Sequence, residues 1–226
     1  NHAIITTRDG DTRAIIALQA GSVPADQDFV LNWSPANGQS PEVGLFRERV
    51  DGTAHLVTTV LPPQELDPTI ALKPRDIVLI LDKSGSMHGA AIAQAKQAIR
   101  LAIARLPTDA RFNLIAFDNV ATPLFNGLRP ANEAFITQAF NALDKLDADG
   151  GTEMRDALDL AFDSARDPDR LMQIVFLTDG AVSNERELFD MIDRRLGDAR
   201  LFTVGIGSAP NSFFMRRAAE AGRGSF

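Results

Sequence analysis

Three short polar stretches of the sequence hold side chains that could act together: residues 82–86 (DKSGS), 147–152 (DADGGT) and 178–180 (TDG). Their candidate groups are two carboxylates and three hydroxyls, namely Asp82, Ser84, Ser86, Thr152 and Asp179. A set of oxygen ligands without nitrogen or sulfur suits a hard divalent cation, and this mixture suits a small octahedral ion that keeps some of its water. The pattern therefore predicts a Mg²⁺ site, with Mn²⁺ or Ca²⁺ as alternatives.

The spacing of the first stretch has a physical reason. A turn that leaves a strand can aim alternate side chains at one point, as Asp82, Ser84 and Ser86 would, and Gly85 lets the backbone bend closely around an ion. Two carboxylates offset the charge of a dication and leave its coordination shell incomplete. Such a metal would attract one more anionic oxygen from a partner.

A catalytic interpretation of the same stretch is weaker. Ser86 and His88 lie two residues apart at the expected start of a helix, where their side chains diverge, and SGSMHG does not match the Gly-x-Ser-x-Gly elbow of hydrolases. Aspartyl phosphotransfer would need a second acid two positions after Asp82, where Ser84 stands. The sequence thus favours a non-enzymatic module. A metal-dependent hydrolase or phosphatase remains the alternative, with His88 or a carboxylate as base.

Alternating strands and helices are predicted from residue 76 onward. DIVLIL (76–81) and QIVFLT (173–178) are almost continuous apolar runs, which are typical of strands buried on both faces of a parallel sheet. Further strands are expected at 111–117 and 199–206, and VATPLF (120–125) is expected to be an antiparallel edge strand. Amphipathic helices are expected between them, at 87–106, 132–146, 154–165 and 184–196.

This alternation predicts a doubly wound, mostly parallel, Rossmann-like α/β domain over residues 76–226. In such sheets ligands bind at the carboxyl ends of the strands. Residues 82–86 and 178–180 each follow a predicted strand directly, so they should meet at that edge. Residues 147–152 connect two helices, and their place at the same edge is an inference from the chemistry.

The first 66 residues have a different pattern. Short strand-like runs are separated by turn signals such as Asp9-Gly10 and Asp51-Gly52, which favour antiparallel β structure. Trp33 is expected in the core of this region. Residues 67–75 belong to a proline-rich connector. The predicted strands lie at 3–7, 12–18, 28–33, 43–50 and 54–60.

Composition excludes several classes of function. The 226 residues carry a formal net charge of −7, which argues against nucleic-acid binding. Cysteine is absent, so thiolate chemistry and zinc–thiolate sites are excluded. Three dispersed histidines make a histidine-based metal site a poor candidate. No apolar run reaches the roughly 20 residues that a transmembrane helix needs.

Taken together, the three polar stretches resemble the metal-ion-dependent adhesion site of von Willebrand factor type A domains. The matching patterns are Asp-x-Ser-x-Ser at 82–86, Gly-Thr at 151–152 and Thr-Asp-Gly at 178–180. The resemblance covers residues 76–226 and implies that the two serines contact the metal directly. It also implies that the other members contact it directly or through water: Thr152, Asp82 and Asp179.

The resemblance implies a protein-binding, adhesion-type module in which an Asp or Glu of the partner completes the metal shell. A metal-dependent hydrolase, or an intracellular scaffold of the same fold, is the alternative. The wider sequence is similar to inter-alpha-trypsin inhibitor heavy chains and to bacterial envelope proteins, including sortase-target proteins of marine proteobacteria.

That wider similarity implies further expectations. Residues 1–66 would be the tail of a VIT (vault/inter-alpha-trypsin) domain, and the location would be the cell envelope or the extracellular space. The type A domain is expected to lack its last strand and helix at the C-terminus.

Overall fold

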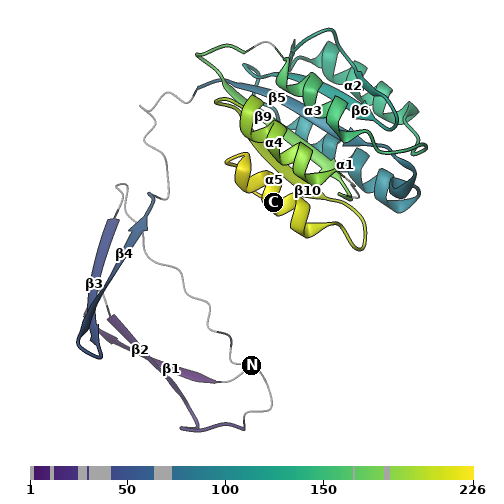
Figure 1. Ribbon diagram of the computed structural model, residues 1–226. Helices are drawn as coiled ribbons and strands as arrows, with labels where there is room; N and C mark the ends of the chain where they lie inside the picture. The colour runs from purple at the N-terminus through teal and green to yellow at the C-terminus, as the bar shows by residue number, and fades with distance from the viewer. Residues whose placement is uncertain are drawn as a thin grey trace. The chain divides into compact units, whose positions relative to one another are not determined.

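The computed structural model describes residues 3–10, 13–24, 30, 42–63, 73–164, 166–180 and 184–226. The chain forms two compact units, residues 1–71 and 72–226 (Figure 1).

The first unit contains two antiparallel hairpins. One pairs β1 (Ile4–Asp9) with β2 (Arg13–Leu18), and the other pairs β3 (Glu42–Val50) with β4 (Thr53–Leu61). In the second hairpin Asp51 and Gly52 both have positive φ, 49° and 80°, as a type I′ turn requires. The predicted antiparallel β region is therefore confirmed.

Two expectations for this unit are not addressed by the described residues. Most of the strand predicted at 28–33, and Trp33 with it, lies outside them. The assignment of this unit to a VIT domain also stays a prediction.

A six-stranded sheet forms the centre of the second unit, with the strand order β10-β9-β5-β6-β7 and with β8 paired to β6. The pairs β10–β9, β9–β5 and β5–β6 are parallel, whereas β7 and β8 run antiparallel to β6. The predicted doubly wound class is confirmed, and so is the antiparallel edge strand near residue 121. The strands are β5 (Arg75–Asp82), β6 (Arg111–Phe117), β7 (Ala121–Pro123), β8 (Arg129–Pro130), β9 (Leu171–Thr178) and β10 (Arg200–Gly205).

Helices cover both faces of this sheet (Figure 1). One face packs against α1 (Ala90–Ala104) and α2 (Glu133–Lys145). The other face packs against α3 (Met154–Phe162), α4 (Glu185–Arg195) and α5 (Ser212–Ala221). The first four were predicted from the sequence, with ends that differ by a few residues. Helix α5 was not predicted, although Asn211 caps it by accepting a hydrogen bond from the Phe214 N–H.

The central strand explains why this unit folds as a layered structure. Residues 76–82 of β5 are all buried, and their side chains alternate between the two cores. Val78 and Ile80 belong to the core under α3, α4 and α5, while Leu79 and Leu81 belong to the core under α1 and α2. A strand buried on both faces cannot slip by one residue without exchanging its whole apolar set, so its end point is fixed.

The amino-terminal edge of the sheet is stabilised by a buried carboxylate. Asp76 is 1% exposed and accepts hydrogen bonds from Arg111 Nε at 2.9 Å and from Arg170 Nε at 2.6 Å. Burial acts to raise the pKa of Asp76, but hydrogen bonds and charge from the two arginines outweigh it, so the pKa lies below its ordinary value of 3.8. Ionised Asp76 therefore stabilises the fold at neutral pH.

Replacing this carboxylate should give a pH-dependent loss of stability. We expect Asp76→Asn to lower the free energy of unfolding by about 3 kcal/mol at about pH 7, because it removes the buried carboxylate that two partly buried arginines share. Since the folded-state pKa is depressed, the wild-type advantage should shrink as the pH falls below about 4. Urea denaturation followed by the helical circular dichroism signal measures both values. The exposed Asp198→Asn variant is the control, and a pH-independent difference would contradict the prediction.

Candidate metal centre

Two neighbouring parallel strands end at the same edge of the sheet and bring two of the polar stretches together. Strand β5 ends at Asp82 and β9 ends at Thr178, and the two strands pair in register as far as Leu81 and Leu177. The chain moves from β5 to β6 on one side and returns to β9 on the other. The loops after β5 and β9 therefore diverge at a topological switch point, where open α/β sheets bind ligands.

Asp82, the last residue of β5, is the buried acidic residue of this site. Its carboxylate is fully buried, and its Oδ1 accepts a hydrogen bond from the Ser84 N–H at 2.8 Å. Its Oδ2 accepts one from Thr178 Oγ1 at 2.6 Å. Thr178 Oγ1 in turn accepts from the Gly180 N–H at 2.9 Å. The carboxylate is thus held between the two loops.

The electrostatics of Asp82 favour a nearby cation. Burial raises the pKa of the Asp82 carboxyl, and the charge of Asp179 adds to this effect, while hydrogen bonds from Ser84 and Thr178 act in the opposite direction. A divalent ion beside the two carboxylates would offset both the desolvation and their mutual repulsion. The donor set and its charge therefore fit a hard divalent cation.

The two serines of the first stretch lie side by side. Their Oγ atoms are 3.1 Å apart and share a hydrogen bond. Ser84 is buried and Ser86 is exposed, so one hydroxyl lies in the protein and the other lies at the surface. Between β5 and α1 the chain makes a short 3₁₀ turn, η1 (Gly85–Met87), and the buried Met87 fixes it to the core.

The third stretch lies against the first. The Gly85 N–H donates to the Gly150 carbonyl at 3.0 Å, and the Asp149 N–H donates to the Lys83 carbonyl at 2.9 Å. A Cβ at Gly85 would lie 3.3 Å from the Gly150 oxygen, so glycine permits this close approach. The inferred position of residues 147–152 at this edge is therefore supported, and the loop that carries Thr152 adjoins the serine loop.

Asp179 is positioned by an element that sequence reasoning missed. Its carbonyl accepts a hydrogen bond at 2.8 Å from the N–H of Asn211, the residue that caps α5. The next residue, Gly180, has a φ of +74°, and a Cβ there would lie 3.1 Å from the Asn211 Cβ. The turn after β9 thus depends on glycine and on the start of α5.

The structure gathers the five predicted residues at one edge, and their role as metal ligands stays a prediction. Within the described part of the chain, no three His, Cys, Asp or Glu side chains form a cluster that could hold a metal. The candidate centre therefore depends on its hydroxyls. Thr178 belongs to the predicted Thr-Asp-Gly stretch, but sequence reasoning gave its side chain no role, and the hydrogen bond to Asp82 emerges only in the structure.

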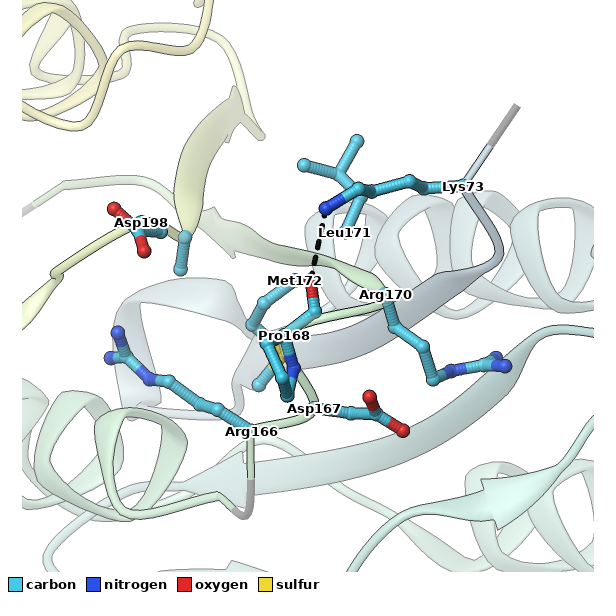
Figure 2. A pocket seen from close by; sticks show the side chains of 9 residues that line it. Lys73, Arg166, Asp167, Pro168, Arg170, Leu171, Met172 and Asp198 are labelled. Atoms are coloured by element: carbon cyan, nitrogen blue, oxygen red, sulfur yellow. Dashed lines mark hydrogen bonds between the residues drawn. The ribbon is translucent and has the colours of Figure 1, made fainter. Parts of the chain in front are cut away.

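Two hollows among the described residues of the second unit lie at opposite edges of the sheet. One, of about 440 Å³, lies beside the candidate centre and is lined by Ser86, His88, Ala90, Ala91, Gln94, Gly207 and Ser208. The other, of about 360 Å³, lies where β5, β9 and β10 begin, at the opposite edge (Figure 2). There Lys73 Nζ donates to the Pro168 carbonyl at 2.9 Å, and Arg166 donates to the Leu196 carbonyl at 2.7 Å. These cations are bound to backbone oxygens.

Comparison with known families identifies the family of the second unit. The family profile described as von Willebrand factor type A domain matches residues 75–226. The chain belongs to the von Willebrand factor type A family. A solved structure, the von Willebrand factor type A protein from Catenulispora acidiphila, superposes with a TM-score of 0.63 at 25% identity. That superposition covers 84% of this chain and 46% of the other.

Curated relatives extend the similarity. A von Willebrand factor A domain-containing protein of Dictyostelium discoideum is 27% identical over 175 residues, which is 77% of this chain and 19% of the relative. Human inter-alpha-trypsin inhibitor heavy chain H4 is 31% identical over 159 residues, 65% of this chain and 17% of the relative. The chain thus spans about a fifth of the length of these relatives.

A further structural neighbour was solved with a bound metal. Proximal thread matrix protein 1 from the mussel byssus, solved with a zinc-occupied MIDAS (metal-ion-dependent adhesion site) motif, has a TM-score of 0.52 at 22% identity. The alignment covers 65% of this chain and 39% of that protein. At this identity the likeness shows a shared fold.

The hydroxyl of Thr178 should be needed to hold the site together. We expect Thr178→Val to lower the free energy of unfolding by about 2 kcal/mol, because it leaves the buried Asp82 Oδ2 and the Gly180 N–H without their partner. Thr178→Ser keeps the hydroxyl and loses one methyl group, so it should cost about 1 kcal/mol. Urea denaturation in EDTA measures both, and a valine variant as stable as the serine variant would contradict this role.

Proposed function

We propose that the type A domain binds a divalent cation and uses it to bind an acidic side chain of a protein partner. Ser84, Ser86 and Thr152 would contact the metal, and Asp82 and Asp179 would hold its water shell. The observation that carries the proposal is the buried Asp82 carboxylate, which is fixed by two hydrogen bonds beside a second carboxylate and a pair of hydroxyls.

The charge balance supports a divalent cation, which we propose is Mg²⁺, and an anion as its further ligand. Asp82 and Asp179 supply two negative charges, which match a dication, while the hydroxyls are neutral. Lys83 lies between two of the proposed ligands, but its charge is offset by an ion pair with Asp118. The metal would therefore be neutralised yet incompletely coordinated, and a carboxylate from Asp or Glu is the hard oxygen ligand that suits it.

The exposure of the site is consistent with binding a protein. Asp82 and Ser84 are buried, whereas Ser86 is exposed and lines the hollow beside α1. A metal bound by these residues would have its open coordination position toward solvent. The mussel byssus neighbour, which shares the fold and was solved with a zinc-occupied adhesion-site motif, is a precedent for a metal in a protein of this fold.

The proposed function is binding without a catalytic step. Ser86 Oγ is hydrogen-bonded to Ser84 Oγ, and among the described residues no hydrogen bond joins it to the imidazole of His88. A serine in that setting lacks the neighbouring base that nucleophilic attack needs.

We also propose a setting outside the cytoplasm, in the cell envelope or the extracellular space. This proposal rests on the resemblance of the sequence to inter-alpha-trypsin inhibitor heavy chains and to bacterial envelope proteins. None of the described helices is long and apolar enough to cross a membrane. The complete reading frame would test the proposed location, because it would show whether a secretory signal exists.

Loss of the central carboxylate should abolish the response to metal. We expect Mg²⁺ to raise the melting temperature of the wild type and to leave that of Asp82→Ala unchanged, because the variant loses half of the negative charge of the site. Differential scanning fluorimetry with Mg²⁺ and with EDTA measures the shift, and circular dichroism checks that the variant is folded. Asp193→Ala, an exposed change near the end of α4, is the matched control. Equal shifts in Asp82→Ala and the wild type would rule out the site.

The partner should be recognised through a carboxylate. We expect peptides selected from a displayed random library on the immobilised domain in Mg²⁺, and released by EDTA, to share an Asp or Glu. Replacing that acid with Asn or Gln should abolish binding, because a neutral amide is a weaker ligand for a hard cation. Enriched peptides that lack a shared acid, or that bind equally in EDTA, would contradict the proposal.

A further inference from the structure

The turn after β6, residues 118–119, holds the backbone on both sides of Thr152. The Gly151 N–H donates to the side-chain oxygen Oδ1 of Asn119 at 3.0 Å. The Glu153 N–H donates to the backbone carbonyl of Asp118 at 2.7 Å. Thr152 is therefore bracketed by two hydrogen bonds to a turn that belongs to none of the three polar stretches.

The Asn119 side chain packs directly on the two glycines before Thr152. A Cβ at Gly151 would lie 2.5 Å from the Asn119 Oδ1, and a Cβ at Gly150 would lie 2.9 Å from its Nδ2. Gly150 also has a φ of +83°, which a residue with a side chain rarely adopts. The two glycines thus allow the amide of Asn119 to approach the backbone of the threonine loop.

The turn is itself fixed to the serine loop. The Lys83 ammonium forms an ion pair with the Asp118 carboxylate, and both side chains are only about one-fifth exposed, at 21% and 22%. The Lys83 N–H donates to the Phe117 carbonyl at 2.8 Å, and the Lys83 carbonyl accepts from the Asp149 N–H at 2.9 Å. Lys83 therefore contacts the end of β6 and the threonine loop while its neighbours, Asp82 and Ser84, belong to the metal site.

We propose that Asn119 is a positioning residue for the metal site and that the Lys83–Asp118 ion pair anchors it. Asn119 acts through Gly151, and it sets the distance of Thr152 from Ser84 and Ser86. Asn119 is neutral, so its removal does not change the charge around a cation, and an effect on metal affinity would report geometry. This inference rests on the proposed metal function.

Removing the Asn119 amide should weaken metal binding more than it weakens the fold. We expect Asn119→Ala to bind Mg²⁺ about tenfold more weakly by isothermal titration calorimetry, because groups that orient metal ligands typically contribute that much. Asn119→Asp keeps the accepting oxygen, and its added charge favours a cation, so its affinity should equal or exceed that of the wild type. Asn126→Ala, an exposed change in the loop after β7, is the matched control and should have wild-type affinity.

A second measurement does not depend on metal. In EDTA, the backbone amide of Gly151 should exchange with solvent faster in Asn119→Ala than in the wild type, as observed by NMR. Slow exchange restored in Asn119→Asp would support the hydrogen bond as the cause. Unchanged exchange in Asn119→Ala would overturn the positioning role.

Substitutions of Lys83 test the proposal through the direction of the change in Mg²⁺ affinity. If its charge alone mattered, Lys83→Met would tighten Mg²⁺ binding, because a positive charge near the ion is removed. The proposal instead requires weaker binding in Lys83→Met and near wild-type binding in Lys83→Arg, which keeps the ion pair. Tighter binding in the methionine variant would overturn the anchoring role.

The outcomes separate the inference from the function on which it rests. If the wild type binds Mg²⁺ and Asn119→Ala binds it equally well, the positioning role is wrong and the metal site stands. If the wild type and all variants fail to bind Mg²⁺, Mn²⁺ and Ca²⁺, both the proposed function and the positioning role are wrong.

Discussion

The candidate site depends on one buried carboxylate at the end of the central strand. Asp82 has lost its hydration, and its oxygens are held by the Ser84 N–H and the Thr178 hydroxyl. Without a nearby cation, the ionised form is opposed by burial and by Asp179. The surrounding loops therefore converge on a group whose charge is most stable when a positive ion lies beside it. In this sense the arrangement resembles a prepared cation site more than a strand-to-helix turn.

Two opposite edges of the same sheet use buried aspartates in different ways. At the amino edge, Asp76 is matched within the chain by Arg111 and Arg170, and its pKa is lowered. At the carboxyl edge, Asp82 has hydroxyl and amide donors, and its pKa is raised. The first arrangement stabilises the fold by itself. The second leaves a charge to be balanced, which is the physical difference between a structural ion pair and a candidate metal centre.

The loops that form the candidate site differ in how firmly the rest of the fold holds them in place. The loop after β5 begins at a strand fixed on both faces by apolar packing, whereas the loop that carries Thr152 connects two helices and has no strand of its own. Its position depends on the glycines at 150 and 151 and on hydrogen bonds to Lys83, Asp118 and Asn119. This dependence explains why a polar turn outside the metal motif becomes relevant to its geometry. The type A family supplies the fold, and local contacts of this kind would determine how well the proposed metal ligands meet.

The sequence by itself determined the alternation of strands and helices, the buried character of β5 and β9, and the set of oxygen-bearing residues. These follow from local patterns: apolar runs mark buried strands, and alternating polar residues after a strand mark a turn that aims side chains at one point. Only the tertiary structure decided that Thr178 holds Asp82, that the start of α5 holds the Asp179 turn, and that Asn119 holds Gly151, next to Thr152. The hydrogen bonds that make these contacts join residues that are 96, 32 and 32 positions apart along the chain. No periodicity encodes such pairs, because they arise only when packing of the sheet and its helices brings the loop ends together.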